Sequence, residues 1–357
     1  MITYDNIIFS LQRAGGISIY WYELIKRLNL ECKEVKFYET PNDNIFRSDL
    51  DIDIQPESKI PLKILRYLSF RKRLEANSIF HSSYYRISLQ KDVKNIVTVH
   101  DFTYEYFRKG LALRVDKYQK KFAMQHAAGI ICVSENTKKD LLKFYPDINE
   151  SKIKVVYNGV SDEFSYNQNY SKHIKKKFPE LSSKKYLIYV GDRSSYKNFD
   201  IALSVIKEKK DIDLVIIGGK EFSEEERVQI KSIQSQVHHY KGISIEDLNI
   251  LYSGAFCLLY PSSYEGFGIP VTEAMKSGCP VIAYKKSSIP EVAGDAGLLV
   301  DNLDLKNFID KINKLENDEF RKKIIEKGLS QAKKFSWDKC FNETYQFYQD
   351  ILNGVRN

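Results

Sequence analysis

Two glutamates beside a glycine-rich turn could bind the hydroxyl groups of a sugar. Glu265 follows an apolar run at 256–260, and seven residues separate it from Glu273, which we expect in the first turn of the next helix. Gly266 and Gly268 let backbone N–H groups approach a ligand closely, and a helix N-terminus favours negative charge. Each carboxylate could accept hydrogen bonds from vicinal hydroxyls of a ribose or hexose. Taken singly, each of these residues could have a purely structural role, but the combination favours a binding site.

Two basic residues lie in a second turn of the same kind. Arg193 and Lys197 follow the apolar run 186–190, and Asn198 can cap the helix after them. In this strand–loop–helix setting the two cations could clamp a diphosphate, in the place of a divalent metal ion. The alternative is a solvated basic loop.

The first half of the chain offers weaker candidates at the ends of expected strands. Gly15 and Gly16 form a turn that could expose N–H groups to an anion, although no G-x-G-x-x-G pattern is present. His100 ends a buried run and could hydrogen-bond a sugar. For His81 and Arg86, an acceptor-side role and a structural role are equally open.

No residue pattern predicts a metal site or a disulfide framework. The D-x-D patterns at 51–53 and 211–213 resemble ordinary strand edges, and the histidine pair 238–239 lacks the spacing of metal ligands. The odd number of widely spaced cysteines indicates reduced thiols. These are Cys32, Cys132, Cys257, Cys279 and Cys340.

Apolar runs that alternate with amphipathic segments must position these residues. Runs such as Ile2–Phe9 and Phe256–Tyr260 predict parallel strands covered on both faces by helices. The polar interval 161–185 is the candidate linker. We therefore expect an α/β protein with two doubly wound domains. The expected domains are 1–163 and 164–335, with a final helix, 336–353, packing back on the first.

Charge and hydropathy narrow the location and the partners. The net charge is +8, 43% of residues are hydrophobic, and no run is long enough to span a membrane. Without a signal-peptide pattern, we expect a cytoplasmic protein that binds no nucleic acid. The basic amphipathic segment 61–74 could rest on the inner face of an anionic membrane, or pack its apolar stripe on the first domain.

In order and content these motifs resemble the retaining GT-B glycosyltransferases of family four (glycosyl transferases group 1), of the bacterial surface-polysaccharide type. The resemblance runs from Gly15 to Trp337. It implies two Rossmann-like domains facing a cleft, with the donor in the second domain and the acceptor in the first. One departure is visible: Asp192 stands where the family has arginine, and Arg193 comes one residue later.

The resemblance assigns roles to individual residues. Glu273 would contact the nucleotide ribose and Glu265 the donor sugar, while His100 would hydrogen-bond that sugar. Lys197 and Arg193 would neutralise the diphosphate. The remaining donor contacts would come from two backbone turns. They are Gly15, Gly16, Phe267, Gly268 and Ile269.

The expected reaction is metal-independent, without any cofactor, and retains the anomeric configuration. A hexosyl group would pass from a nucleotide sugar to a glycan or lipid-linked sugar in surface-polysaccharide or lipopolysaccharide synthesis. GDP-mannose is the first donor to test, with UDP- and dTDP-sugars close behind. The alternatives are a nucleotide-sugar epimerase, a phosphorylase and a non-catalytic sugar-binding subunit. Base, sugar, acceptor, linkage and oligomeric state cannot be read from the sequence.

Overall fold

The chain forms two compact units in the computed structural model, which describes residues 1–31 and 34–354. Unit 1 comprises residues 1–159 together with the segment from Trp337 onward, and unit 2 comprises Val160–Ser336. The boundary lies after Gly159, whereas the sequence placed it after residue 163. Among the described residues, no helix has both the length and the apolar character needed to cross a membrane.

Unit 1 is built on a parallel sheet whose strand order is β3-β2-β1-β4-β5-β6-β7. The strands are β1 Ile2–Asp5, β2 Val35–Glu39, β3 Ile54–Pro56, β4 Ser78–Ser82, β5 Val93–Val99, β6 Gly129–Cys132 and β7 Ile153–Val155. The run Ile2–Phe9 is not one strand as predicted, because β1 ends at Asp5 and a short helix follows. All of Ile7, Ile8 and Phe9 are buried, and a continuous apolar run cannot distinguish a buried helix from a strand.

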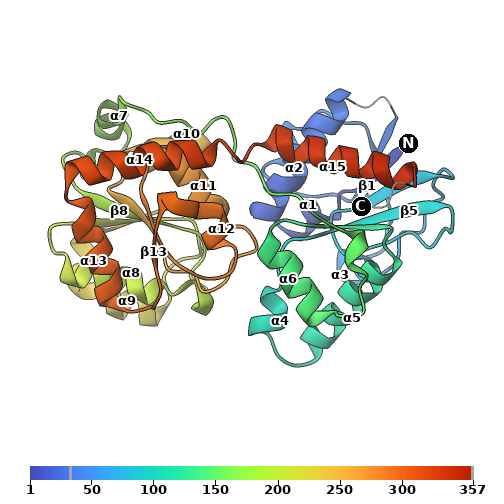
Figure 1. Cartoon of the computed structure of the whole chain (residues 1–357), viewed down its shortest axis with the longest axis horizontal. Coiled ribbons are helices and arrows are strands. Elements are labelled where there is room, and N and C mark those ends of the chain that lie inside the picture. The colour runs from blue at the N-terminus through green and yellow to red at the C-terminus, as the bar shows by residue number, and fades with distance from the viewer. Residues whose placement is uncertain (32–33, 355–357) are drawn as a thin grey trace. The chain divides into compact units, whose positions relative to one another are not determined.

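Helices cover both faces of the unit 1 sheet. They are α1 Ile7–Leu11, α2 Gly16–Glu31, α3 Leu62–Leu65, α4 Thr103–Phe107, α5 Leu111–His126, α6 Glu135–Phe144 and α15 Trp337–Leu352. Figure 1 shows α2 and α15 on one face and α5 and α6 on the other. Helix α15 returns to unit 1 from the end of the chain. It buries Trp337, Phe341 and Tyr348 in the same apolar cluster as Trp21 of α2.

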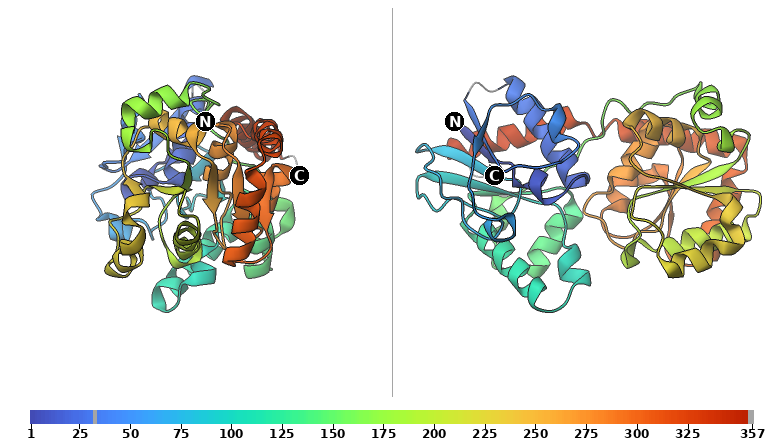
Figure 2. Two further views of the ribbon diagram at one scale, coloured as in Figure 1. Left: turned by 90° about the vertical axis from the view of Figure 1, so that its left-hand side faces the viewer. Right: turned by 180° about the vertical axis from the view of Figure 1, so that it is seen from behind.

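Unit 2 repeats the architecture with a parallel sheet ordered β10-β9-β8-β11-β12-β13. Its strands are β8 Tyr186–Val190, β9 Asp213–Ile217, β10 Val237–Tyr240, β11 Cys257–Tyr260, β12 Val281–Tyr284 and β13 Gly297–Val300. Its helices are α7 Tyr170–Lys177, α8 Phe199–Glu208, α9 Glu224–Ile230, α10 Ile245–Gly254, α11 Ile269–Lys276, α12 Ile289–Ala293, α13 Leu305–Leu315 and α14 Asp318–Ala332. Figures 1 and 2 show α10, α11 and α14 on one face of the sheet and α8, α9 and α13 on the other.

The polar interval 161–185 belongs to unit 2 and is not a free linker. Its helix α7 packs against α10, and Phe164, Ile174 and Phe178 are buried. Three apolar anchors at wide spacing are enough to dock a lysine-rich segment, because long lysine stems leave their charges in water.

The segment 61–74 also differs from the predicted amphipathic helix. Only Leu62–Leu65 is helical, and Leu65, Phe70 and Leu74 are 2%, 3% and 6% exposed. Phe70 and Leu74 share an apolar cluster with strand residues Tyr38 and Phe80. These three side chains pack on unit 1, as in the second of the two alternatives, whereas Ile64 and Tyr67 of the same segment are 55% and 47% exposed.

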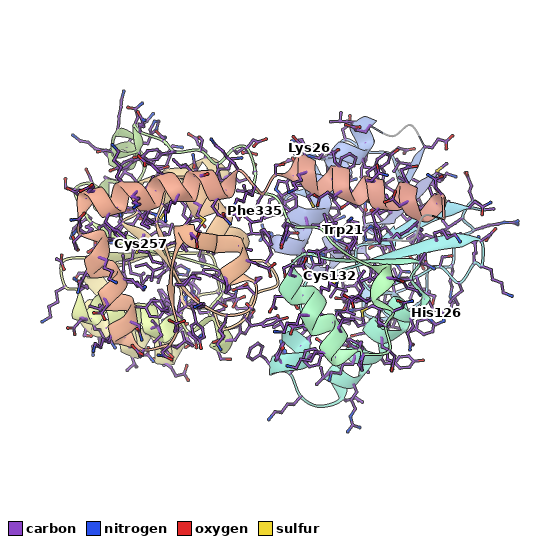
Figure 3. The ribbon with its side chains drawn as sticks, in the orientation of Figure 1. Trp21, Lys26, His126, Cys132, Cys257 and Phe335 are labelled. Atoms are coloured by element: carbon purple, nitrogen blue, oxygen red, sulfur yellow. The ribbon has the colours of Figure 1, made fainter. Side chains whose placement is uncertain are left out.

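The described cysteines are buried free thiols, which agrees with the expectation of reduced core residues. Cys132 ends β6 and Cys257 begins β11, both inside their units (Figure 3). Cys279 and Cys340 are buried in the same way. Cys32 lies outside the described residues.

Candidate functional site

The centre of the unit 2 sheet is where its chain order reverses. Strand β8 is hydrogen-bonded to β9 on one side and to β11 on the other. In open parallel sheets, ligands bind beyond the carboxyl ends of the strands at such a switch point. The loops after β8 and β11 are the two that carry Lys197 and Glu265.

The side chains of Lys197 and Glu265 meet at this edge. Lys197 Nζ lies 2.8 Å from Glu265 Oε1, and the two side chains are 14% and 13% exposed. Burial lowers the pKa of Lys197, but the charges of Glu265, Tyr196 and Asp192 and the hydrogen bond to Glu265 together outweigh it, and the net shift is upward. Lys197 therefore stays a cation at neutral pH, with its carboxylate partner beside it.

Asn198 joins the two loops. Its backbone is left-handed, with φ of 49°, a conformation that asparagine tolerates better than most residues. Its side-chain amide donates to Pro261 O and to Ser263 Oγ, each at 2.8 Å. The backbone bond from Ser263 N to Tyr196 O, also 2.8 Å, reinforces the link. Lys197 and Glu265 are thus held in place by neighbouring backbone rather than by each other alone.

Two serines that sequence reasoning did not single out hold the Glu265 loop from the other side. Ser287 Oγ accepts from Glu265 N at 2.9 Å. Ser288 Oγ, fully buried, bonds Glu265 O at 3.0 Å and Phe267 O at 2.9 Å. Both serines follow β12, so the signal available in the sequence was a serine pair at the carboxyl end of the next strand.

Gly268 allows the turn into α11. Its φ is 96°, which side-chain-bearing residues rarely adopt. A Cβ atom there would also come within 2.8 Å of Ile289 Cδ1. Phe267, in the same turn, buries its ring against Phe335 at 5.4 Å between centroids, so that it can offer a ligand its backbone only. Ile269 is the first residue of α11.

Glu273 is a buried carboxylate on α11. It is the fifth residue of the helix, so it lies in the second turn and not in the first turn as predicted. It is 8% exposed, and Tyr252 Oη donates to its Oε2 at 3.1 Å. Burial raises the pKa of Glu273 to about 7, although the Tyr252 hydrogen bond opposes the shift. Such a group has a strong requirement for further hydrogen-bond donors when it is ionised.

Arg193 does not join Lys197. Its Nε lies 2.7 Å from Glu226 Oε1, its Nη2 donates to Lys220 O at 2.6 Å, and its guanidinium lies 4.7 Å from the Phe222 ring. The side chain is 5% exposed. The guanidinium thus ties the loop after β8 to the loop after β9. Its Nη1 is buried and has no hydrogen-bond partner among the described residues, so the expected contact with a diphosphate stays a prediction. Asp192 precedes Arg193, and its Oδ1 accepts from Ser194 N at 2.8 Å.

In unit 1, His81 and Arg86 lie in the interior and not on an acceptor-facing surface. His81 Nδ1 is 2.5 Å from Tyr348 Oη, and Nε2 is 2.9 Å from Thr98 Oγ1, so both ring nitrogens are bonded. Burial lowers the pKa of this histidine. Arg86 forms ion pairs with Asp5, at 2.7 Å, and with Glu57, and its side chain is 1% exposed.

His100 differs from His81 in the hydrogen bonding of its ring. Its Nε2 is buried and has no hydrogen-bond partner among residues 1–31 and 34–354. Burial lowers its pKa to about 4, so the ring is neutral at pH 7. A buried nitrogen without a partner is a place where a ligand or water can bond. Gly15 and Gly16 lie at the start of α2 in the same unit, with Gly16 its first residue.

The described ranges contain no group of three or more His, Cys, Asp or Glu side chains arranged to hold a metal ion. What the structure brings together in unit 2 is a cation, two carboxylates and a glycine turn at one sheet edge. That set can bind a polyhydroxylated ligand that carries an anionic group.

Comparison with known proteins identifies the chain. Residues 171–331 match Glycosyl transferases group 1, and residues 14–164 match Glycosyltransferase Family 4. The O-antigen chain mannosyltransferase B of Escherichia coli is 25% identical, over 94% of this chain and 96% of its own length. The O-antigen chain mannosyltransferase RfbU of Salmonella typhimurium is 32% identical over 62% and 60%, respectively.

A comparison with a solved structure identifies the fold. The Anabaena protein HepE, in complex with UDP and glucose, superposes with a TM-score of 0.74 at 14% identity, covering 97% of this chain and 98% of that one. Both units therefore have the Rossmann-like form of the GT-B fold. The chain therefore carries a Glycosyltransferase Family 4 domain followed by a Glycosyl transferases group 1 domain, and it is a glycosyltransferase.

Proposed function

We propose that this glycosyltransferase binds a nucleotide-sugar donor at the Lys197–Glu265 edge of unit 2. It transfers the hexosyl group, with retention, to a glycan or lipid-linked sugar in surface-polysaccharide synthesis. The observation that carries the proposal is the juxtaposition of Lys197 with Glu265 at the switch point, in the loop that leads into the helix of the buried carboxylate Glu273.

Each residue has a role that follows from its chemistry. Lys197 neutralises charge that develops on the departing diphosphate, assisted by the N–H groups of the glycine turn. Glu273 accepts hydrogen bonds from the ribose hydroxyls, which supply the donors that its burial demands. Glu265 faces the transferred sugar. With Arg193 bonded to Glu226, no role in charge neutralisation is assigned to that arginine. In unit 1, His100 Nε2, which has no hydrogen-bond partner in the described part of the chain, is the candidate contact for a sugar hydroxyl.

Mannose is the sugar to test first. Two relatives that match this chain are named as O-antigen chain mannosyltransferases. This supports GDP-mannose over UDP- and dTDP-sugars as the donor and an O-antigen-type glycan as the product. As expected for the family, the leaving phosphate itself accepts the proton of the acceptor hydroxyl.

A thermal-shift panel of nucleotide sugars tests the donor. We expect GDP-mannose to raise the melting temperature of the full chain most, because a ligand that binds only the folded state stabilises it. Equal responses to all nucleotide sugars, or none, would contradict the assignment.

Turnover of the best ligand must then require a sugar acceptor. Turnover without an acceptor would indicate an epimerase, and a requirement for inorganic phosphate would indicate a phosphorylase.

Removal of divalent metal should leave the activity intact. Lys197 and backbone N–H groups supply the charge neutralisation in this proposal, so EDTA is expected to change the transfer rate by less than about twofold, too little to represent a lost catalytic group. The measurement compares initial rates before and after EDTA treatment, with Mg²⁺ and Mn²⁺ added back separately. A loss of activity that either ion restores would show that the reaction uses a metal.

A further inference from the structure

The backbone between β12 and α12 is left-handed at Ser287. Its φ is 50°, in a region that glycine enters freely and that costs a residue with a Cβ atom free energy. Ser287 follows β12 and so lies at the carboxyl edge of the unit 2 sheet. A serine keeps such an angle only when its surroundings compensate for it, and angles of this kind are concentrated at functional sites.

The compensating contact is a hydrogen bond to the turn that carries Glu265. Ser287 Oγ accepts from Glu265 N at 2.9 Å, although the two residues are 22 positions apart. Glycine would adopt the same φ without strain, but it would bring no hydroxyl group to Glu265. The serine therefore combines an unfavourable backbone angle with a contact that only its side chain can make.

Ser288 holds the same turn at two further points. Its Oγ lies 3.0 Å from Glu265 O and 2.9 Å from Phe267 O, and the side chain is fully buried. A hydroxyl group has one proton to donate, so the two carbonyl groups share it. Sharing requires both carbonyls to face one point, which fixes the backbone on either side of Gly266.

Ile289 contacts the end of the turn. A Cβ atom on Gly268 would come within 2.8 Å of Ile289 Cδ1, and Ile289 is fully buried. Ile289 is also the first residue of α12, which packs against α11, the helix that begins after the turn (Figure 1). Three consecutive residues thus hold the turn 265–268 from its first residue to its last.

We propose that the segment 287–289 is a template for the turn 265–268, and that Ser287 is a positioning residue for sugar transfer. Lys197, at 2.8 Å, holds the Glu265 carboxylate, whereas Ser287 holds the Glu265 backbone. The inference rests on the proposed function, in which Glu265 faces the transferred sugar. It adds a residue that acts through the turn and not on the ligand.

Substitutions at residue 287 separate the hydroxyl group from the backbone angle. Ser287→Ala keeps the strained angle and loses the hydroxyl, whereas Ser287→Gly loses both. We expect each to lower kcat roughly 10- to 30-fold, below the about 100-fold that a 1 Å misplacement can cost. The glycine variant should nonetheless melt at a higher temperature than the alanine variant, because glycine tolerates positive φ. Ser287→Thr, which keeps a hydroxyl, should recover most of the lost kcat, although a β-branched residue is the least stable at this angle.

Kinetics and binding distinguish positioning from stability. The probes are GDP-mannose for turnover and GDP alone for binding, or another donor and its diphosphate if the thermal-shift panel selects one. The affinity for GDP should stay within about twofold of the wild-type value in the alanine and glycine variants, because Lys197 and Glu273 are unchanged. Ser204→Ala, which removes a 2.8 Å hydrogen bond to Asp200 O on α8, is the matched control and should keep the wild-type kcat.

Amide hydrogen exchange measures the contact without turnover. The Glu265 N–H should exchange roughly tenfold faster in Ser287→Ala and Ser287→Gly, because its acceptor is gone. An unchanged exchange rate, an alanine variant with full kcat, or kcat values that follow the melting temperatures of the three variants would overturn the positioning role alone. A wild type that transfers no sugar would overturn the proposed function, and the positioning role with it.

Discussion

Replacing Lys197 by alanine is expected to lower kcat by roughly 10²- to 10³-fold, the usual effect of losing one preorganised charge-stabilising group. KM should change much less, because the charge on the diphosphate develops as the sugar departs and Lys197 acts mainly on that transition state. Steady-state kinetics with the donor found in the thermal-shift panel provide the measurement.

Two further variants distinguish the loss of charge neutralisation from a loss of stability. Alanine substitution leaves Glu265 without its 2.8 Å partner, so K197A/E265Q removes that uncompensated charge. We expect the double variant to regain stability and not kcat. Lys207→Ala, at an exposed position on α8, is the matched surface control. If K197A kept a wild-type kcat, the cation assigned to the diphosphate would be the wrong one.

Replacing Glu273 by glutamine is expected to stabilise the protein at alkaline pH while it weakens donor binding. Below pH 4.5, the ordinary pKa, the carboxyl is protonated in both the folded and unfolded states. Between pH 4.5 and about 7, the folded state keeps the proton that the unfolded state has released. The free energy of unfolding therefore falls as pH rises through this window, and the loss is complete above pH 7.

Glutamine imitates the protonated carboxyl and does not suffer this loss. We expect the variant to exceed the wild type in stability by less than about 1 kcal/mol at pH 5 and by about 3 kcal/mol at pH 8. Urea unfolding of the full chain at both pH values measures the difference. A glutamine variant that is less stable than the wild type at pH 8 would contradict the inference that the ionised, buried carboxylate lowers the free energy of unfolding.

The Glu273→Gln substitution also tests the proposed role of Glu273 in donor binding. Hydrogen bonds to a charged acceptor contribute about 1.5–3 kcal/mol each, so donor affinity at pH 8 should fall roughly 10- to 100-fold. Tyr252→Phe, which removes only the 3.1 Å hydrogen bond to Oε2, is the control that keeps the carboxylate. Unchanged donor affinity in the glutamine variant would remove Glu273 from the proposed ribose site.

The resemblance of their motifs assigned Lys197 and Glu265 to one donor site, and the structure brings their side chains together although they are 68 residues apart. Each follows an apolar run, and the carboxyl ends of parallel strands meet at one edge of a sheet. That reasoning needs no distances, because strand periodicity and the parallel arrangement decide it. The two-domain α/β fold followed in the same way, from alternating strand and helix patterns along the chain.

Arg193 shows where such reasoning stops. One residue along a loop changes the side toward which a side chain projects, and its partner Glu226 is 33 residues away on α9. Whether this guanidinium faces a phosphate or a neighbouring loop depends on how that loop packs. No local sequence pattern predicts which of the two the guanidinium faces.

His81 and the segment 61–74 illustrate the same limit. His81 resembles any strand-end histidine until α15, 267 residues later, covers it with Tyr348. The segment 61–74 has a basic amphipathic pattern, yet it buries Phe70 and Leu74 in an apolar cluster and leaves Ile64 and Tyr67 exposed. A pattern indicates that a stripe exists, but the packing partners decide which side of the helix is covered.

The sequence by itself therefore determined the fold class, the sheet edge at which we propose the donor site, and the residues Lys197, Glu265 and Glu273 as its candidates. These depend on local periodicity and on the geometry common to all parallel sheets. Only the tertiary structure decided that Arg193 and Arg86 are held in ion pairs and that Glu273 is buried enough to raise its pKa to about 7. Burial and ion pairing are set by segments far apart in the chain, so they arise only when the units have packed.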